Sequence, residues 1–401
     1  MKRTGAIAWV VIGCLCMSCL CGCGDILTQI KDTASSVLQA VVTDGNSFPA
    51  APPLEPLGEE KPLVEGLTPL SKREYYGYAL LAKEENGTAL QTVYNRLAAG
   101  VEAMDEEINL NDSTAWVTVD QLNMVWLWYC ADYPQHFWRN NGYAYKWDKN
   151  SGNVMSISPE YTMTKEERDT NEPLVEAAAT AILTDLRGLS GEYERELAIH
   201  DAMATAVTYD KEAKYAYDVF GALAEGKAVC EGYAEAFQYL LHQAGIQCLI
   251  AVGTGNSELH GWNVVRIDGN YYFTDVTWDD TEEKDIPVMH TYFNLTEELL
   301  KRDHVLDLTS SYPLPPCTAI AANYHVKNGS MVETFSVQQI VGLLKKGKGT
   351  AEVYLAKQTP QEYWDWFADN SRAIADKIGF AGKGYDCSGY MTDFGIRITI
   401  K

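Results

Sequence analysis

The sequence predicts an α+β fold, with a cysteine at the start of a helix and a histidine and an aspartate on a β-hairpin that follows it. Apolar residues after Cys230 recur at steps of three and four, which is the spacing of an amphipathic helix. Residues 260–267 and 270–275 have strand character and flank Asp268-Gly269, a dipeptide typical of a two-residue hairpin turn. Helical spacing dominates before this central segment, and helix and strand patterns alternate after it. We therefore expect a mostly helical N-terminal extension at 71–189, a central domain at 190–310 and a small α/β unit at 318–401.

Length and charge limit the class of protein. The chain has 401 residues, of which 46% are hydrophobic, and this is enough for two or three globular domains. The net charge of −23 argues against nucleic acid and against anionic membrane surfaces as partners. No cysteine or histidine spacing in the sequence predicts a zinc site, so we expect neither a metal nor an organic cofactor.

Residues 1–22 have the pattern of a secretion signal, with a short basic start and an apolar run that is too short to span a membrane comfortably. The string Leu20-Cys-Gly-Cys23 resembles the lipobox of bacterial lipoproteins, in which the cysteine after the cleavage point is acylated. That resemblance makes Cys23 the expected lipidation site, with Cys21 and Cys19 as rivals and an ordinary cleaved signal as the alternative. It implies an extracytoplasmic protein held on the outer face of the cell membrane by a lipid anchor.

Residues 23–70 are expected to form a tether. Residues 26–42 have the spacing of a short amphipathic helix. The rest is rich in proline and acidic residues, which favour a semi-extended spacer. The prolines are Pro49, Pro52, Pro53, Pro56, Pro62 and Pro69.

Helical spacing runs through most of the region 71–189. Apolar residues predict helices at 72–84, 90–107, 119–129 and 172–187 and a hairpin within 137–158. Two interpretations fit the clustered aromatic residues, a hydrophobic core and a sugar-binding platform, and the core is the commoner role. These aromatic residues are Trp126, Trp128, Tyr129, Phe137 and Trp138.

Cys230 stands at or next to a helix N-terminus. The helical pattern extends from Tyr233 to Leu241, and Gly245 just beyond it is a typical stop signal. Unpaired backbone N–H groups and the helix dipole favour an anion at a helix start, so a thiolate is stabilised there. A cysteine at such a position is more often only a small buried residue. With a base nearby it becomes a candidate nucleophile.

The register of the hairpin decides whether a base and an aspartate can meet. With a two-residue loop, His260 stands opposite Thr277, and Trp262 stands opposite Asp275. Because side chains repeat every two residues, His260 and Asp275 then share one face as diagonal neighbours. A three-residue loop would put them on opposite faces, so the register tests the site.

Three segments resemble the signature motifs of the transglutaminase-like superfamily: Ala228-Val-Cys-Glu-Gly-Tyr-Ala234, His260-Gly-Trp-Asn263 and Thr274-Asp-Val-Thr-Trp-Asp279. The resemblance implies a papain-like core in which Cys230 is the nucleophile, His260 the base and Asp275 the residue that orients the histidine. It also implies that an aromatic or amide side chain ahead of the cysteine helps the cysteine N–H to hold an oxyanion. Tyr209, Tyr215 and Tyr217 are the candidates, and no motif chooses between them.

These features make the protein a candidate thiol acyl-transfer enzyme at the cell surface. A thiolate attacks a carbonyl carbon and forms a thioester, which water resolves in a peptidase or amidase and an amine resolves in a transglutaminase. We expect hydrolysis of peptide or isopeptide bonds in a peptide or protein substrate at the cell envelope. The alternatives are a protein-crosslinking transglutaminase, a non-catalytic envelope-binding or scaffold protein on the same fold, and a main function carried by the C-terminal unit.

Further expectations concern the flanks of the central segment. We expect residues 290–294 to complete the sheet, His304 to be peripheral, and His200, on a helix predicted over 192–207, to be structural. In the C-terminal unit the patterns predict strands at 324–326, 351–356 and 394–400 and helices at 335–346 and 360–378.

Overall fold

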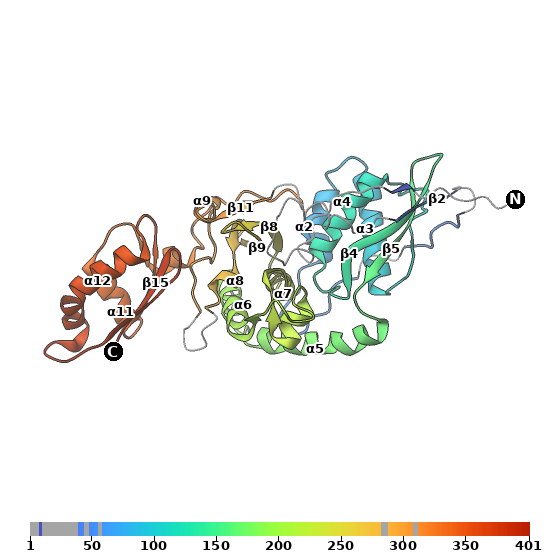
Figure 1. Cartoon of the computed structure of the whole chain (residues 1–401). Coiled ribbons are helices and arrows are strands. Elements are labelled where there is room, and N and C mark those ends of the chain that lie inside the picture. Colours follow the sequence, from blue (N-terminus) through green and yellow to red (C-terminus); the bar gives the residue numbers. More distant parts are fainter. Residues whose placement is uncertain (1–7, 10–38, 44–47, 55–57, 282–287, 308–311) are drawn as a thin grey trace.

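The computed structural model describes residues 8–9, 39–43, 48–54, 58–281, 288–307 and 312–401 (Figure 1). The lipidation candidate Cys23, most of the signal segment and residues 26–38 of the expected tether helix lie outside these described residues. Within the tether, Gln39–Thr43 forms a strand, β2, so the helix expected up to residue 42 is wrong over its last residues. The strand forms because its backbone pairs in parallel with β4. Among the described helices, none combines the length and the hydropathy that a membrane crossing needs.

The N-terminal region places three helices, α2, α3 and α4, beside a five-stranded sheet of order β1-β2-β4-β5-β3 (Figure 1). The predicted hairpin is present as β4 and β5, and the helix expected over 72–84 is a 3-10 turn followed by a short helix. The five clustered aromatic residues are buried, so they form core, as expected. The bounds are β1 Ala8–Trp9, the 3-10 turn Lys72–Glu74, α2 Tyr76–Leu81, α3 Gly87–Glu102, β3 Ile108–Asn109, α4 Val119–Asp132, β4 Arg139–Asp148 and β5 Val154–Tyr161.

Helix α5 (Lys165–Thr184) runs from beneath β5 to beneath α7 (Figure 1). It begins earlier than the predicted residue 172 because Thr164 caps it. The Thr164 hydroxyl accepts from the Glu167 N–H, and the Glu167 carboxylate accepts from the Thr164 N–H. This reciprocal pair satisfies backbone donors that would otherwise lack a partner at the helix start.

The central sheet has four antiparallel strands in the order β10-β9-β8-β11. Residues 290–294, which were expected to complete it, form turns instead, and only Leu295 beyond them bridges to Phe273 of β10. The strand at the other edge is β11, which no sequence pattern indicated. The bounds are β8 Cys248–Gly255, β9 Glu258–Ile267, β10 Asn270–Thr274 and β11 His304–Leu306.

The turn between β9 and β10 has the two residues that the sequence predicts. Asp268 and Gly269 both have positive φ, 49° and 83°, as a type I′ turn requires. Across the hairpin Asn263 pairs with Thr274, and Ile267 pairs with Asn270. The predicted register of the hairpin is therefore confirmed, but its return strand ends at Thr274, and Thr277, which was expected opposite His260, lies in the short helix α8 (Val276–Asp279).

Helix α7 (Cys230–Gln243) packs against β8 and β9. The Asn263 side-chain amide on β9 donates to the Ala234 carbonyl of α7 at 2.9 Å, which fastens the hairpin to the helix. Gly232 lies so close to the preceding loop that a Cβ there would meet the Ala216 carbonyl oxygen at 2.5 Å. The other central elements are α6 Glu192–Ala206, β6 Thr208–Tyr209, a π-helical turn Gly221–Glu225, β7 Lys227–Ala228, α8 Val276–Asp279 and α9 Glu297–Leu300.

The C-terminal unit packs α11 and α12 on one side of a sheet of order β12-β13-β15-β14 (Figure 1). The strand expected at 324–326 is wrong, because Asn323 caps a helix there by accepting from the His325 and Val326 N–H groups. The other predicted elements are present to within a few residues. The bounds are α10 Tyr324–Asn328, β12 Met331–Val332, α11 Val337–Lys346, β13 Thr350–Leu355, α12 Pro360–Ala375, a π-helical turn Asp376–Phe380, β14 Cys387–Met391 and β15 Gly395–Ile400.

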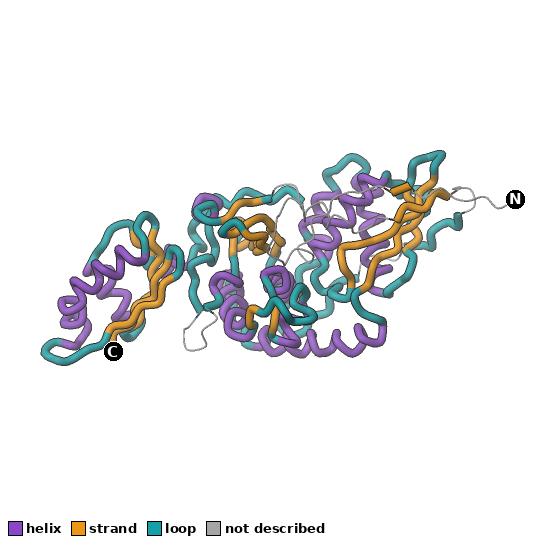
Figure 2. The backbone as a smooth tube through the Cα atoms, in the orientation of Figure 1, coloured by secondary structure: helices purple, strands orange, loops and turns teal. Residues whose placement is uncertain are grey.

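The described residues build two hydrophobic cores. One runs from Val64 to Ala322 and joins the N-terminal and central regions. The second runs from Val332 to Ile400 and belongs to the C-terminal unit alone. Figure 2 shows the corresponding separation of the C-terminal helices and strands from the rest.

Candidate active site

The candidate nucleophile, Cys230, is the first residue of α7. Val229 before it has an extended backbone, and its carbonyl accepts the first helical bond, from the Tyr233 N–H at 3.0 Å. The N–H groups of the first helical turn, that of Cys230 included, have no intrahelical acceptor. These groups and the helix dipole favour negative charge on the thiol and on an oxygen atom bound beside it.

His260 joins the thiol to Asp275. Its Nε2 lies 2.6 Å from the Asp275 Oδ2, and the Cys230 side chain is near enough to the ring to raise the pKa of His260. Because Nε2 is committed to the carboxylate, Nδ1 is the nitrogen that serves the thiol. The structure therefore brings together three side chains from three separate motifs.

Burial and charge shape the site together. Cys230, His260 and Asp275 are 6%, 5% and 1% exposed. Burial acts to lower the pKa of His260, but the Asp275 carboxylate and the Cys230 side chain raise it to about 10. Burial acts to raise the pKa of Asp275, but the charges and hydrogen bonds of His260 and His304 hold it well below its usual range. At neutral pH the site therefore holds an imidazolium next to a carboxylate.

Both oxygens of Asp275 are engaged. Oδ1 accepts from the Trp278 N–H at 3.2 Å and so caps the N-terminus of α8. Oδ2 faces Nε2 of His260 and, at 3.3 Å, Nε2 of His304. The cap and the two imidazoles fix the orientation of the carboxylate.

The position that we predicted for His304 from the sequence is wrong. It was expected to be peripheral, but it is 1% exposed and contacts Asp275. Its Nδ1 lies 2.6 Å from an Asp303 oxygen, and the other Asp303 oxygen accepts from the Tyr292 hydroxyl at 2.7 Å. Burial acts to lower the pKa of His304, but Asp275 and Asp303 raise it above its usual value. We call Cys230, His260, Asp275 and His304 the thiol cluster.

Two glycines on β8 make room for the thiol cluster. Gly253 pairs with His260 on β9, and Gly255 pairs with His304 on β11, so both histidines lie on one face of the sheet. A Cβ on Gly255 would lie 2.6 Å from the Trp278 ring. The alternation Gly253-Thr-Gly255 is thus a sequence signal from which large side chains on this face could have been predicted.

Two indole rings flank the His260 imidazole. The Trp262 and Trp278 rings stack on it at centroid distances of 5.6 and 5.1 Å. Both tryptophans belong to the motifs that carry the histidine and the aspartate. Their apolar faces restrict rotation of the imidazole and shield its bond to Asp275 from water.

The three candidate oxyanion tyrosines lie in the segment that leads to α7. Tyr209 is on β6, where it pairs with Ala228 two residues before Cys230. Tyr215 accepts a hydrogen bond from the Lys214 ammonium at 2.5 Å and packs its ring edge-on against Phe220. Tyr217 is half-buried in the loop between them and the cysteine. Their role stays a prediction.

Comparison with known proteins agrees with the motifs. Residues 180–276 match the family model described as the transglutaminase-like superfamily. The Kyphoscoliosis peptidase of Mus musculus is 24% identical over 248 residues, which cover 55% of this chain and 37% of that protein. The Homo sapiens Kyphoscoliosis peptidase is 26% identical over 156 residues, which cover 34% of this chain and 23% of that protein. The chain thus spans well under half the length of these relatives. Among solved structures, a TGase is 16% identical, with 36% of this chain and 52% of that chain covered and a TM-score of 0.26.

Proposed function

We propose that this chain, which carries a transglutaminase-like domain over residues 180–276, is a thiol hydrolase that cleaves peptide or isopeptide bonds. The observation that carries the proposal is the grouping of Cys230, at the start of α7, with the hydrogen-bonded pair of His260 and Asp275. A purely structural role needs neither a thiol at a helix N-terminus nor a charged imidazole beside it.

The residues account for each step of acyl transfer. The Cys230 sulfur attacks the carbonyl carbon, and the oxyanion that forms is held by backbone N–H groups at the start of α7. His260 gives its proton to the leaving amine as the C–N bond breaks, which leaves a thioester on the sulfur. His260 then takes a proton from the attacking water, and the C–S bond breaks, which releases the acid and restores the thiolate and the imidazolium. Asp275 fixes the ring and stabilises its charged form.

Hydrolysis is favoured over crosslinking by the likeness to peptidases. Both curated relatives are named as peptidases, although the chain covers 37% and 23% of their lengths. In a transglutaminase an amine takes the place of water in the second half of the reaction, and the same three side chains serve both outcomes.

The decisive measurement is the pH dependence of iodoacetamide labelling at Cys230. Because His260 keeps its proton up to a pKa of about 10, an imidazolium faces the sulfur throughout the neutral range. Labelling at about pH 6 is therefore expected to be fast in the wild type and at least roughly ten times slower in His260→Ala. Cys387, which lies in the other core, serves as the internal reference because the same substitution leaves its rate unchanged.

A second candidate function is favoured by the low exposure of the thiol. Cys230 is 6% exposed, and an inert buried cysteine suits a binding or scaffold protein on the same fold. The labelling experiment separates the two functions. Labelling that is slow and equal in the wild type and in His260→Ala would favour the scaffold, and hydrolysis would then have to be abandoned.

We also propose that the protein acts outside the cytoplasm, attached through a lipid on Cys23. The support is the lipobox-like string at residues 20–23 and the apolar run before it. Mass spectrometry of the N-terminal peptide tests this. A diacylglyceryl adduct that is absent from Cys23→Ala is the expected result, and an unmodified Cys23 in the wild type would exclude it as the attachment site.

A further inference from the structure

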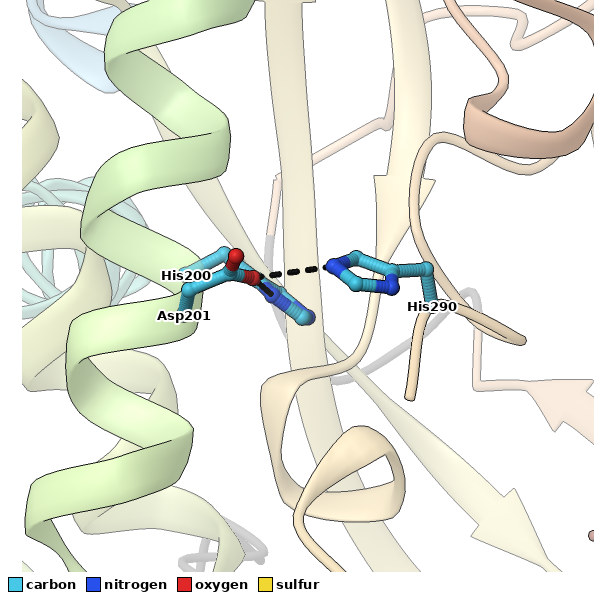
Figure 3. Close-up of side chains that lie close together, drawn as sticks. All are labelled: His200, Asp201 and His290. Carbon is cyan, nitrogen blue, oxygen red and sulfur yellow. Dashed lines mark hydrogen bonds and ion pairs between the residues drawn. The ribbon is translucent and has the colours of Figure 1, made fainter. Parts of the chain in front are cut away.

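A second cluster of histidine and aspartate lies outside the thiol cluster. His200 and Asp201 come from α6, and His290 comes from the segment that follows α8 (Figure 3). The Asp201 Oδ1 lies 3.0 Å from the Nδ1 of His200 and 3.0 Å from the Nε2 of His290. One ligand atom from each residue thus falls within 4.8 Å of the others. We call these three residues the open cluster, because the Asp201 side chain is 46% exposed.

Each imidazole of the open cluster is backed by a further carboxylate. The Nε2 of His200 lies 3.2 Å from the Oδ2 of Asp279, the last residue of α8. The Nδ1 of His290 lies 3.1 Å from the Oε2 of Glu352 on β13. Histidines that bind metals usually donate their other ring N–H to a carboxylate, which fixes the tautomer and makes the free nitrogen more basic.

We propose that His200, Asp201 and His290 hold a divalent transition-metal ion of the zinc class, with the exposed side of Asp201 left open for water. The three donors are two imidazole nitrogens and one carboxylate oxygen, which suits zinc and its neighbours and does not suit magnesium or calcium. His200 was expected to be structural, and in this proposal its structural role is to bind the metal ion.

Two of the three distances between donor atoms are close to those that a small dication needs, and the third, between the two histidine nitrogens, lies within 4.8 Å. Bonds of ~2.0–2.1 Å at tetrahedral angles place ligand atoms roughly 3.3 Å apart. The two distances of 3.0 Å from the Asp201 oxygen therefore have to widen by only a few tenths of an ångström. Rotation of the half-exposed Asp201 side chain supplies that change without disturbing a core.

The charges balance when a metal ion replaces two protons. Without metal, each imidazole faces a carboxylate oxygen from both of its nitrogens, an arrangement that two imidazolium ions satisfy. A dication that displaces one proton from each ring leaves the net charge of the cluster unchanged. Binding is then expected to release about two protons for each metal ion.

The ion would join the two hydrophobic cores. His200 and Asp201 belong to the helix α6 of the first core, and Glu352, which backs His290, lies on β13 of the second. Glu352 also forms an ion pair with Arg397 of β15 at 2.6 Å. Its carboxylate accepts a hydrogen bond from the backbone N–H of His290 at 2.7 Å. A metal ion at the open cluster would thus stabilise the contact between the central domain and the C-terminal unit.

The test titrates Co²⁺ into the purified, metal-stripped full chain, because four-coordinate Co²⁺ absorbs visible light whereas Zn²⁺ does not. We expect one Co²⁺ per chain, displaced by Zn²⁺, and a release of about two protons in calorimetry with buffers of different ionisation enthalpy. Asp201→Asn, at a half-exposed position, is expected to weaken binding at least about 100-fold, and Glu352→Gln to weaken it about 10- to 100-fold.

The matched control is His304→Gln, since His304 belongs to the other cluster of histidine and aspartate. This variant is expected to bind Co²⁺ as the wild type does. The proposal is overturned if the wild type binds no Co²⁺, if Asp201→Asn binds as tightly as the wild type, or if His304→Gln is the variant that loses the ion. Circular dichroism confirms that each variant is folded, and the proton release is measured on the wild type, so a misfolded variant does not leave the proposal untested.

Discussion

The thiol cluster and the open cluster lie at the two ends of the short helix α8. Asp275 caps the N-terminus of α8 in the first cluster, and Asp279 at the other end backs a histidine of the second. The carboxylate between the two imidazoles is 1% exposed in the first cluster and 46% exposed in the second. Both clusters place a carboxylate between two imidazoles, so the surroundings of these three groups decide what each cluster does.

The neighbours of the imidazoles make the second difference. In the thiol cluster, one ring nitrogen of His260 faces a sulfur atom at a helix start, so a proton can move between a base and a nucleophile. In the open cluster, both outer nitrogens face carboxylates, and no nucleophile is among the three residues. A buried proton donor beside a thiol suits acyl transfer, whereas an open carboxylate with two backed imidazoles suits a cation.

The largest loss of activity is expected when the sulfur of Cys230 is removed. Cys230→Ala is expected to lower kcat/KM for a peptide substrate at least about 1,000-fold, because the thioester can no longer form. Asp201→Asn in the open cluster is expected to leave kcat/KM within about threefold of the wild type, since it touches no reacting atom. A fluorogenic peptide library provides the substrate, and thermal unfolding shows whether each variant is folded. Loss of folding in Cys230→Ala would make Cys230 a packing residue and would contradict the catalytic role.

The next effect comes from the central carboxylate of the thiol cluster. Asp275→Asn keeps the shape of the side chain and removes the charge that holds the His260 proton. We expect kcat to fall about 100- to 10,000-fold, while iodoacetamide still labels Cys230. The pKa of His260, followed by NMR, is expected to fall from its value of about 10, because the negative charge of Asp275 that raises it most is gone. An unchanged His260 pKa would mean that Asp275 does not act on the imidazole.

A smaller effect is expected from His304, a positioning residue. His304→Gln keeps one N–H donor for Asp275 and removes a positive charge, so kcat is expected to fall about tenfold with little change in KM. Without the His304 charge, Asp275 stabilises the His260 imidazolium more strongly, which raises the pKa of His260. The alkaline limb of the pH–rate profile should therefore move to higher pH. A profile that does not move would show that His304 serves only the packing of β11.

Local patterns predicted the part of the site that lies on single elements. The helix that begins at Cys230 and the hairpin turn at Asp268 and Gly269 follow from periodicity and turn chemistry over a few residues. From the register of that turn we predicted correctly that His260 lies beside Asp275. These predictions needed no knowledge of tertiary contacts.

The missed features depend on contacts between distant segments. β11 has three residues, which is too short for an alternation to appear, and it exists because it pairs with β8. His304 was therefore placed outside the site. The donors of the open cluster are separated by 89 residues between Asp201 and His290, so no metal-ligand spacing is visible in the sequence. At 324–326, the strand character of the side chains was overridden by the cap that Asn323 supplies.

The last effect concerns stability, not activity, and comes from the proton that the buried His260 holds. Its pKa is about 10 in the folded chain and ~6.5 when unfolded, so its contribution is fully present below about pH 6.5 and is lost as the pH rises through 10. The free energy of unfolding of the wild type, relative to His260→Gln, is expected to fall by roughly a few kcal/mol over that range, as urea denaturation would measure. His242→Gln is the matched control: burial lowers the pKa of His242 to about 4 despite a hydrogen bond to the Cys248 carbonyl, so this residue is neutral throughout the range. A difference that stays constant for His260→Gln as well would mean that the thiol cluster does not hold its proton, and the distinction between the two clusters would then rest on exposure alone.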